Sequence, residues 1–596
     1  SEADVRAIVE DALAGEVDDV DAQKIADLYT SFLDSTRTNE LGMEPFAFDM
    51  NRIEAIESAE DLARFFAQSG WEFGPRPFSW YVDVDDRNSD QYALFLSQSG
   101  TGLPDRSYYF EDQFADARAA YLAYIEQLYS LAGWEGGSEA ARTVLDLETQ
   151  LAEVHWTRVE NRDPEATYNK IAIDDLAENH PNLLIDTIFE EAEISDIDSV
   201  VVRQPSYLEA LNELMTSIPL DDWTTWVQAR TLSSAAPSLS QEFVDANFEF
   251  YGRTLSGQEE DRPRWKKGVS AVNGALGESV GRIYVARHFT PEAKERMDRM
   301  IRNLQEAMRQ SIAELDWMGE ETRERALEKL GTYVFKIGYP DEWEDYSDLE
   351  VEPDDLYGNV RRANRWSYND MIDKLGEPVD RGEWGMYPQT VNAYYNPTFN
   401  EIVFPAAILQ PPFFNVEADD AVNYGGIGAV IGHEFSHGFD DTGSQYDAEG
   451  NLRNWWTDSD REEFERRAGQ LVAQYATYAP FEDASVNGEL TLGENIGDLS
   501  GLTMAQRAYA LSLNGEEAPV IDGYTGDQRF FMGWAQVWRI KYRDAYLRQL
   551  LQVDTHSPGM YRAVGPLSHI PAFYTAFDVQ EGDALFVAEE DRIKLW

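Results

Sequence analysis

Two histidines four positions apart, with a glutamate directly after the first, constrain this chain more than any other feature. The segment reads His433-Glu434-Phe435-Ser436-His437. On a helix, residues i and i+4 lie on one face, so both imidazoles could bind a single metal ion. Glu434 projects about 100° around the helix from His433 and could face a metal-bound water without binding the metal. The spacing predicts a helix that carries two ligands and a base.

A second segment supplies the rest of a metal site. A catalytic zinc ion takes three protein ligands and keeps a fourth position open for water. Residues 493–498 read Gly-Glu-Asn-Ile-Gly-Asp, so Glu494 is the candidate third ligand. Asp498, four positions further on, could orient a ligand histidine through a hydrogen bond. The sequence therefore predicts one zinc ion per chain.

The first motif is hard to obtain by chance. With seven histidines in 596 residues, about 0.01 matches to His-Glu-x-x-His are expected if about a tenth of positions are Glu. The alternative is a solvated helix whose two histidines are structural. The preceding run, residues 424–432, consists of apolar and small residues and indicates a buried helix packed closely against its neighbours. We therefore favour an interior metal site.

Composition excludes several classes of protein. An apolar content of 43% excludes a disordered chain, and 596 residues exceed what one core usually holds. No apolar run is long enough for a transmembrane helix. The chain has no cysteine, which excludes disulfides and a thiol nucleophile. Residues 1–5 form no signal peptide, so we expect a cytoplasmic protein, or a secreted one if an upstream segment is missing.

The charge is strongly negative and spread along the chain. Lys and Arg number 49 against 110 Asp and Glu, a formal net charge of −61. Such a surface repels itself in dilute buffer, so we interpret it as a halophile's adaptation to molar salt, which screens charge. The alternative is an acidic surface that attracts cationic peptides. No basic patch is evident, so nucleic acid is not an expected partner.

Apolar periodicity predicts a mainly α fold with small β-sheets, of the α+β class. Helical spacing occurs at residues 5–13, 22–33, 116–131, 140–155, 206–217 and 292–330. Strands are predicted at residues 78–84, 92–98, 391–395 and 401–404. An edge strand beside the histidine helix would be a track for an extended peptide. We expect a helical lobe at 1–335, a connecting segment at 336–390 and a metal-binding lobe at 391–596.

Motifs along nearly the whole chain resemble the neprilysin and endothelin-converting-enzyme family of zinc endopeptidases. Besides the two segments above, the matching motifs are Leu103–Tyr109, Asn161–Pro164, Asn392–Tyr395, Ile402–Ala406, Gly438–Asp441, Ala535–Trp538 and His556–Gly559. Their number and order make the resemblance specific. It implies a thermolysin-like catalytic lobe that faces a helical lobe across an enclosed cavity, which limits substrates to short peptides.

The resemblance also implies roles at the metal. His433, His437 and Glu494 would bind zinc. Glu434 would act as general base and then as proton donor, and Asp498 would support a zinc ligand.

Further roles concern the substrate. His556 would stabilise the oxyanion, and Arg562 would bind a backbone carbonyl on the leaving-group side. Asn392 and Ala393 would bind the substrate main chain. The apolar pocket after the scissile bond would be lined by Ile408, Phe413, Ala429, Val430, Val537 and Trp538.

Several of these residues have other interpretations when the chemistry is considered alone. Tyr561 could supply the oxyanion donor instead of His556. Arg562 could form a structural ion pair in so acidic a chain. The remaining alternatives are structural: core packing for Phe413 and Trp538, and a turn for Asn392.

The chain departs from the family pattern in four respects. It has no cysteine for the disulfides of animal members, and we expect no membrane anchor, because the chain resembles the soluble prokaryotic members. Ile593 stands where the C-terminal motif usually has cysteine. Ala429 replaces a larger apolar residue, so we expect a wider pocket that accepts Phe, Leu or Tyr. The family normally has a further segment upstream of residue 1 that contributes to the cleft, so we expect part of the substrate site to lie outside this sequence.

The leading hypothesis is a monomeric zinc endopeptidase that cleaves short peptides before bulky hydrophobic residues. One alternative is a peptidyl-dipeptidase-like enzyme that trims dipeptides. Another is a non-catalytic peptide-binding protein of the same fold. The intact Glu434 argues against the last, because binding alone needs no base.

Overall fold

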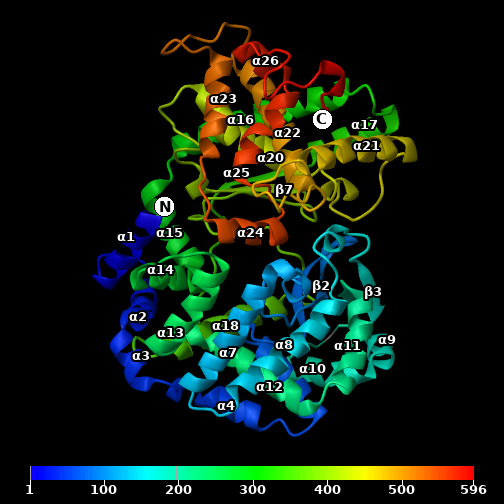
Figure 1. The fold of residues 1–596 in the computed structure, drawn as a ribbon. Helices are drawn as coiled ribbons and strands as arrows, with labels where there is room; N and C mark the ends of the chain where they lie inside the picture. The colour runs from blue at the N-terminus through cyan, green and yellow to red at the C-terminus, as the bar shows by residue number, and fades with distance from the viewer. Residues whose placement is uncertain (1, 196) are drawn as a thin grey trace.

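Buried apolar side chains gather in two large cores, one in each of two lobes (Figure 1). The computed structural model describes residues 2–195 and 197–596. One core draws on residues 46–255 and 357–372 and defines the helical lobe. The other draws on residues 293–337 and 393–596 and defines the catalytic lobe. The predicted two-lobed, mainly helical fold with small sheets is confirmed.

The helical lobe forms because amphipathic helices bury aromatic and aliphatic stripes against one another. In α5 (Ala59–Gly70) the buried positions Leu62, Phe65, Phe66 and Ser69 follow helical spacing. The other main helices are α4 (Ala47–Glu54), α7 (Ala115–Leu131), α8 (Gly137–Val154), α10 (Ile185–Glu191), α11 (Pro205–Ser217), α12 (Leu220–Ala235), α13 (Gln241–Asn247) and α18 (Leu356–Asp373).

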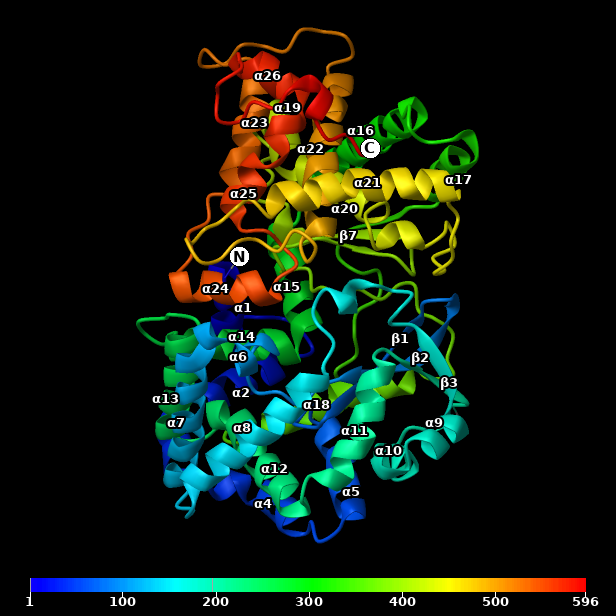
Figure 2. The same cartoon turned by 45° about the vertical axis from the view of Figure 1, so that its right-hand side comes forward.

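A twisted sheet flanks these helices on the side that faces the catalytic lobe (Figure 2). Its order is β1-β2-β4-β3, from β1 (Phe78–Asp85), β2 (Asn88–Gln98), β3 (Asn169–Ala172) and β4 (Ser199–Val202). β1 and β2 form an antiparallel hairpin, β2 pairs parallel to β4, and β4 pairs antiparallel to β3. The hairpin tip reaches the catalytic lobe, where Ser89 Oγ donates to the Glu449 carbonyl at 2.8 Å.

A smaller core joins the lobes. It lies among α1 (Glu2–Leu13), α2 (Ala22–Leu33), α14 (Arg264–Ala275) and α15 (Gly277–His288), at the left of Figure 1. Ala406 and Ala407 of the catalytic lobe pack into the same core. The first helices of the chain are therefore anchored to both lobes.

The catalytic lobe surrounds a three-stranded sheet of order β5-β7-β6. β7 (Glu401–Pro405) is central, parallel to β5 (Val334–Gly338) and antiparallel to the edge strand β6 (Tyr394–Asn396). The main helices are α16 (Pro291–Glu314), α17 (Glu320–Gly331), α20 (Ala429–His437), α21 (Asp458–Tyr475), α22 (Leu492–Ser512), α23 (Gly526–Val537), α24 (Asp544–Val553), α25 (Gly559–Val564) and α26 (Pro571–Phe577).

Glycines bring α20 and α22 into backbone contact. A Cβ on Gly432 would lie 2.4 Å from the Gly501 carbonyl oxygen, and a Cβ on Gly501 would lie 2.3 Å from the His433 nitrogen. A Cβ on Gly497 would lie 2.7 Å from the His433 ring. Any side chain at these positions would push the helices apart. The close approach places Glu494, on the first turn of α22, beside the histidines of α20.

The structure corrects three details of the predicted organisation. The helical stretch at 292–330 is two helices, α16 and α17, because residues 315–319 leave the helix and Gly319 donates to the Asp460 carboxylate at 3.0 Å. The segment 336–390 contains α18, which packs into the helical core. Strand β6 begins at Tyr394, so residues 391–393 lie before it.

The packing also differs from the predicted boundary at residue 335. Met297, Leu304 and Met308 of α16 lie in the core of the catalytic lobe. The chain therefore enters that lobe at α16, returns to the helical lobe for α18, and enters the catalytic lobe again before β6.

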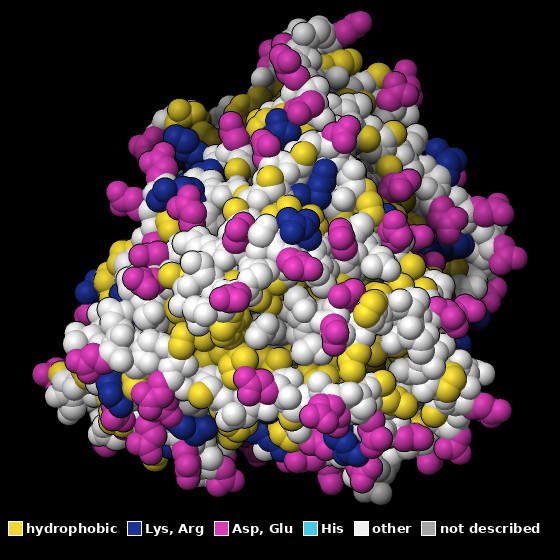
Figure 3. Space-filling model, turned by 60° about the horizontal axis from the view of Figure 1, so that its bottom comes forward, with side chains coloured by type: hydrophobic (Ala, Val, Ile, Leu, Met, Phe, Trp, Pro, Cys, Tyr) yellow, Lys and Arg dark blue, Asp and Glu magenta, His cyan; other side chains and the backbone are white. Residues whose placement is uncertain are grey.

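Acidic side chains are distributed over the surface. In Figure 3, Asp and Glu are scattered across the whole visible face, and Lys and Arg are fewer. Across residues 2–195 and 197–596, every helix is too short or too polar to span a bilayer.

Candidate zinc site

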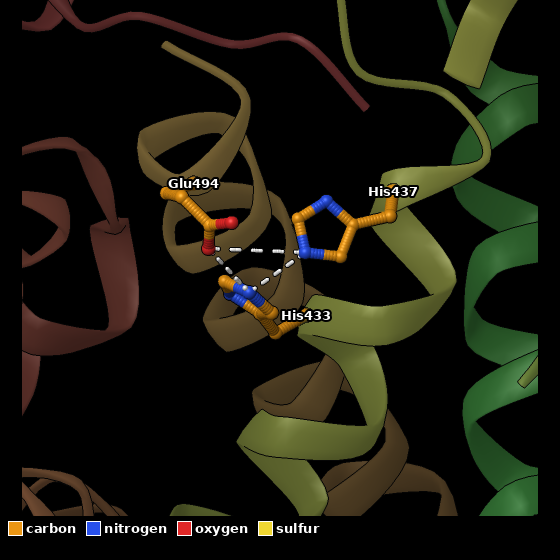
Figure 4. A group of neighbouring side chains, drawn as sticks. All are labelled: His433, His437 and Glu494. Atoms are coloured by element: carbon orange, nitrogen blue, oxygen red, sulfur yellow. Dashed lines mark hydrogen bonds and ion pairs between the residues drawn. The ribbon is translucent and has the colours of Figure 1, made fainter. Parts of the chain in front are cut away.

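His433 and His437 leave α20 on the same side, as the spacing predicts (Figure 4). The helix follows a glycine-rich π-helical turn, Tyr424–Gly428, whose residues are all buried. His433 is 7% exposed and Glu434 is 6% exposed. The predicted buried helix is therefore present, and its polar side chains face an internal site.

Three ligand atoms converge at this site from two helices. His433 Nε2 lies 3.0 Å from His437 Nε2 and 3.0 Å from Glu494 Oε2. His437 Nε2 lies 3.8 Å from Glu494 Oε2. A tetrahedral zinc ion with bonds of about 2.0–2.1 Å would have its ligand atoms roughly 3.3 Å apart. The three side chains therefore fit one zinc ion.

Hydrogen bonds on the far side of each ring support the same conclusion. His433 Nδ1 donates to Asp498 Oδ1 at 3.0 Å, and His437 Nδ1 donates to Asp440 Oδ2 at 2.9 Å. Each neutral imidazole then presents the lone pair of Nε2 to the site. Two lone pairs and the Glu494 carboxylate would repel one another, so the cluster suits a cation between them.

Glu434 lies beside these residues but is not one of the three candidate ligands. Burial raises the pKa of its carboxyl group above the ordinary value, and His433 and His437 partly offset that rise. A carboxylate with a raised pKa is a stronger base, which suits proton transfer near neutral pH.

Asp498 and Arg562 form a buried ion pair behind His433. Arg562 Nε and Nη2 lie 2.8 and 2.7 Å from the two Asp498 oxygens. The guanidinium also lies over the Trp538 ring, 4.0 Å from its centroid. Asp498 therefore contacts both the predicted ligand His433 and Arg562, which forms the ion pair given above as its alternative role.

His556 approaches the site from the opposite wall. Its Nε2 lies 3.1 Å from Glu494 Oε2, and its Nδ1 is paired with Asp554 Oδ1 at 2.8 Å. Burial opposes the charged form, but the hydrogen bond with Asp554 and the negative charge of Glu494 raise its pKa to about 9. The Tyr561 ring instead stacks on Tyr478, with ring centroids 4.6 Å apart.

The site opens into a cavity of about 540 Å³ whose lining residues lie within 386–562. Its walls include most of the residues predicted to contact substrate: Asn392, Ala393, Ile408, Phe413, Val430, Val537, Trp538 and Arg562. Apolar residues absent from the prediction extend the same wall: Met386, Val391, Trp534 and Ile540.

Ala429 does not line this cavity. It is the first residue of α20, and its side chain is fully buried in the core of the catalytic lobe. The neighbouring Val430 lines the cavity instead. The expectation that Ala429 widens the pocket is therefore wrong.

Sequence reasoning missed Asp440, the partner of His437. Its Oδ1 accepts hydrogen bonds from the Thr442 and Gly443 nitrogens at 2.8 and 2.7 Å, which fixes the turn after α20. The available signal was its position three residues after a predicted ligand, where a side chain can reach back to the same helix face.

Comparisons with known proteins agree with this geometry. Residues 1–340 and 392–593 match the sequence models of Peptidase family M13. Endothelin-converting enzyme 1 from Homo sapiens is 37% identical over 532 residues, which cover 85% of this chain and 68% of that protein.

Solved structures give the same result. The zinc metalloprotease Zmp1 from Mycobacterium tuberculosis, in complex with an inhibitor, is 46% identical with a TM-score of 0.97, covering 100% of this chain and 92% of that one. The same metalloprotease in an open state covers 100% and 94% with a TM-score of 0.74. These matches confirm the predicted resemblance: the chain belongs to peptidase family M13, with neprilysin and the endothelin-converting enzymes, and is a zinc metalloendopeptidase.

Proposed function

We propose that this enzyme hydrolyses short peptides on the amino side of a bulky hydrophobic residue. His433, His437 and Glu494 hold the zinc ion, and Glu434 acts as the general base. The observation that carries the proposal is the convergence of three ligand atoms and one unligated carboxylate on the wall of a largely apolar cavity.

When bound, the zinc ion supplies Lewis acidity, which polarises the scissile carbonyl and lowers the pKa of water. Glu434 then accepts a proton from the attacking water at a carboxylate oxygen. It delivers that proton to the nitrogen of the departing amine. The raised pKa of its carboxyl group favours both transfers, because the group can hold the proton between the two steps.

His556 donates to the oxygen of the tetrahedral intermediate. Asp554 holds the proton on Nδ1 and stabilises the imidazolium, so Nε2 carries a second proton that points into the cavity. Arg562 keeps Asp498 in place behind His433 and presents its guanidinium to a substrate carbonyl on the leaving-group side.

The edge strand β6 supports binding of an extended peptide. Tyr394 and Tyr395 of this edge strand line the cavity, and Asn392 and Ala393 directly precede them on the same wall. A peptide that adds to this edge gains main-chain hydrogen bonds, which are independent of its sequence.

Apolar side chains provide the preference for a hydrophobic residue after the scissile bond. Ile408, Phe413, Val430, Val537 and Trp538 line the pocket beside the ligands. A cavity of about 540 Å³ lies within the range of sites that hold small ligands and short peptides. We infer that the lobes separate to admit the peptide, as the open state of the related metalloprotease suggests.

A peptide series that varies only after the scissile bond tests the preference. We expect Phe, Leu and Tyr to be cleaved faster than Gly by roughly 100-fold, because each buried apolar side chain contributes about 1.5–3 kcal/mol. Mass spectrometry of the products distinguishes internal cleavage from the release of dipeptides. Equal rates for Gly and Phe would contradict the proposed pocket.

The variant Glu434→Gln is the matched control for the base. It keeps the size of the side chain and lies outside the ligand set, so zinc content should stay at one per chain. Hydrolysis should fall by ~10³-fold or more when the base is lost. Unchanged hydrolysis with zinc still bound would remove Glu434 from the mechanism.

A further inference from the structure

We propose that Arg162 of the helical lobe is a positioning residue that couples closure of the two lobes to the geometry of the zinc ligands. Arg162 ends the short helix Glu160–Arg162, which precedes β3 in the helical lobe. Its Nη2 donates to both oxygens of Asp441 in the catalytic lobe, at 2.9 and 2.7 Å. Its Nη1 donates to the Leu490 carbonyl at 2.7 Å.

The two contacts reach the two segments that carry ligands. Asp441 directly follows Asp440, which accepts the hydrogen bond from His437 Nδ1. Leu490 lies just before α22, whose first turn carries Glu494. One guanidinium from the opposite lobe thus fixes the turn behind His437 and the entry to the Glu494 helix.

Gly493, which has no side chain, packs against the contact between Arg162 and Asp441. A Cβ there would lie 3.1 Å from Arg162 Nη2 and 3.0 Å from the nearest carboxylate oxygens of Asp440 and Asp441. These separations are tighter than ordinary van der Waals contact, so a side chain would strain the contact among the three charged groups. The absence of a Cβ allows the guanidinium to pack against the start of the Glu494 helix.

The Arg162 contacts depend on closure, because the donor and its acceptors belong to different lobes. Hydrogen bonds between two charged groups are among the stronger ones in proteins, and this pair is partly buried, with the two side chains 16% and 23% exposed. If closure favours the zinc-binding geometry, zinc must favour closure by the same factor. The peptide-enclosing form and the metal-binding form would then stabilise each other.

A second contact between the lobes provides a matched control. Ser89, at the tip of the β1–β2 hairpin, donates through Oγ to the Glu449 carbonyl at 2.8 Å and through its nitrogen to Asn451 Oδ1 at 3.0 Å. These acceptors lie in the loop after the site, and neither residue contacts a ligand. Loss of the Ser89 hydroxyl should weaken closure without acting on the ligands directly.

The inference rests on the ligand set proposed above, so the experiment includes a variant of that set. Zinc affinity is measured by competition with a chromophoric chelator for the wild type, Arg162→Met, Ser89→Ala and His437→Gln. We expect zinc affinity to fall roughly 10-fold in Arg162→Met and less than about 2-fold in Ser89→Ala. His437→Gln should lose most of its affinity; if it does not, the ligand set is wrong, whatever Arg162 does.

Two further variants identify the contact itself. Arg162→Lys keeps the positive charge but not the planar guanidinium with its separate donor nitrogens. Its zinc affinity should therefore lie between those of Arg162→Met and the wild type. Asp441→Asn, within the catalytic lobe, should weaken zinc binding, and combining it with Arg162→Met should add little because both remove the same contact. These two variants also carry the test if Arg162→Met does not fold.

Small-angle X-ray scattering of the zinc-free proteins gives a readout that does not depend on activity. Arg162→Met should have a larger radius of gyration than the wild type, and zinc should compact it less. Zinc affinity within 2-fold of the wild type in Arg162→Met and Asp441→Asn would overturn the proposal. An equal loss in Ser89→Ala would assign the coupling to the interface as a whole and remove the special role of Arg162.

Discussion

Two buried glutamates, one in each lobe, show how the same side chain serves structure in one place and chemistry in another. Glu148 in the helical core is fully buried and accepts hydrogen bonds from the Gly102 nitrogen, Tyr109, Tyr121 and Trp226 at 2.7–3.1 Å. Each of its oxygens receives two donors. Its negative charge is further balanced by Arg230, whose Nε lies 3.4 Å away.

Glu494 in the catalytic lobe has the opposite surroundings. Among the described residues, its Oε2 is buried without a hydrogen bond of good geometry, and its neighbours are imidazole nitrogens. A buried carboxylate without donors is costly, and a metal ion removes that cost. Both carboxylates are buried, so burial does not distinguish them. The number of hydrogen-bond donors around the carboxylate separates the structural glutamate from the metal ligand.

The largest effect is expected from removing the ligand carboxylate. Glu494→Ala should lower kcat/KM by ~10³-fold or more, because the lost metal supplies several kcal/mol to the transition state. The zinc-free protein should remain folded, since the substitution removes a buried charge that had no donors. Zinc content and peptide hydrolysis measure the first effect, and thermal unfolding measures the second. A zinc-free variant that unfolds readily would contradict the assignment of Glu494 to metal binding alone.

The reverse result is expected for the structural carboxylate. Glu148→Ala leaves the buried Arg230 and four donors without their acceptor, so the helical lobe should lose about 3–5 kcal/mol of stability. Zinc affinity of the folded protein should stay unchanged. Denaturant unfolding followed by tryptophan fluorescence measures the stability, and chelator competition measures the affinity. Loss of zinc with unchanged stability would contradict the assignment of Glu148 to structure.

A smaller effect on zinc affinity is expected from Asp440, which contacts a zinc ligand and is not itself a ligand. Asp440→Asn weakens the acceptor that orients His437, so zinc affinity should fall by about 10–100-fold while the fold is kept. For comparison, Asp441→Asn changes the adjacent carboxylate, which bonds Arg162 and leaves the His437 hydrogen bond in place, so zinc affinity should fall less than in Asp440→Asn. An affinity for Asp440→Asn equal to that of the wild type would show that the His437 tautomer needs no support.

Exposed carboxylates form a third group, with the smallest effect per residue. A net charge of −61 should make stability rise as KCl increases from ~0.1 M, where the Debye length is ~10 Å, to ~1 M, where it is ~3 Å. The melting temperature at several KCl concentrations measures this, with choline chloride as a control for ions other than K⁺. Buried Glu148 and Glu494 should contribute little to the dependence. A melting temperature independent of salt would contradict adaptation to molar salt.

Much of the fold follows from the sequence where apolar spacing is strong. Helix α2 has the predicted bounds, 22–33, and the hairpin β1–β2 lies where alternation predicts strands. Helix α18 was missed because its sequence contains Gly, Asn and Ser, which have low helix propensity, and it depends on the burial of Leu356, Tyr357, Tyr368 and Ile372.

The ligand positions were predictable because they lie within short motifs, whereas their supports depend on distant parts of the chain. His433 and His437 are fixed by helical spacing alone. Arg162 belongs to a predicted motif, yet its contact with Asp441 spans 279 positions and no local pattern indicates it. Ala429 was misplaced for a related reason: spacing does not specify which face of α20 the cavity meets, and of the two predicted neighbours Val430 lines it.

The central claim is that the Nε2 atoms of His433 and His437 and the Glu494 carboxylate hold one zinc ion. Zinc K-edge X-ray absorption of the protein loaded with one equivalent of zinc tests it most directly. We predict two imidazole nitrogens at about 2.0–2.1 Å and oxygen ligands at about 2.0–2.2 Å, with the carboxylate contribution lost in Glu494→Ala. A spectrum without imidazole scattering, or one that is identical in Glu494→Ala, would contradict the account.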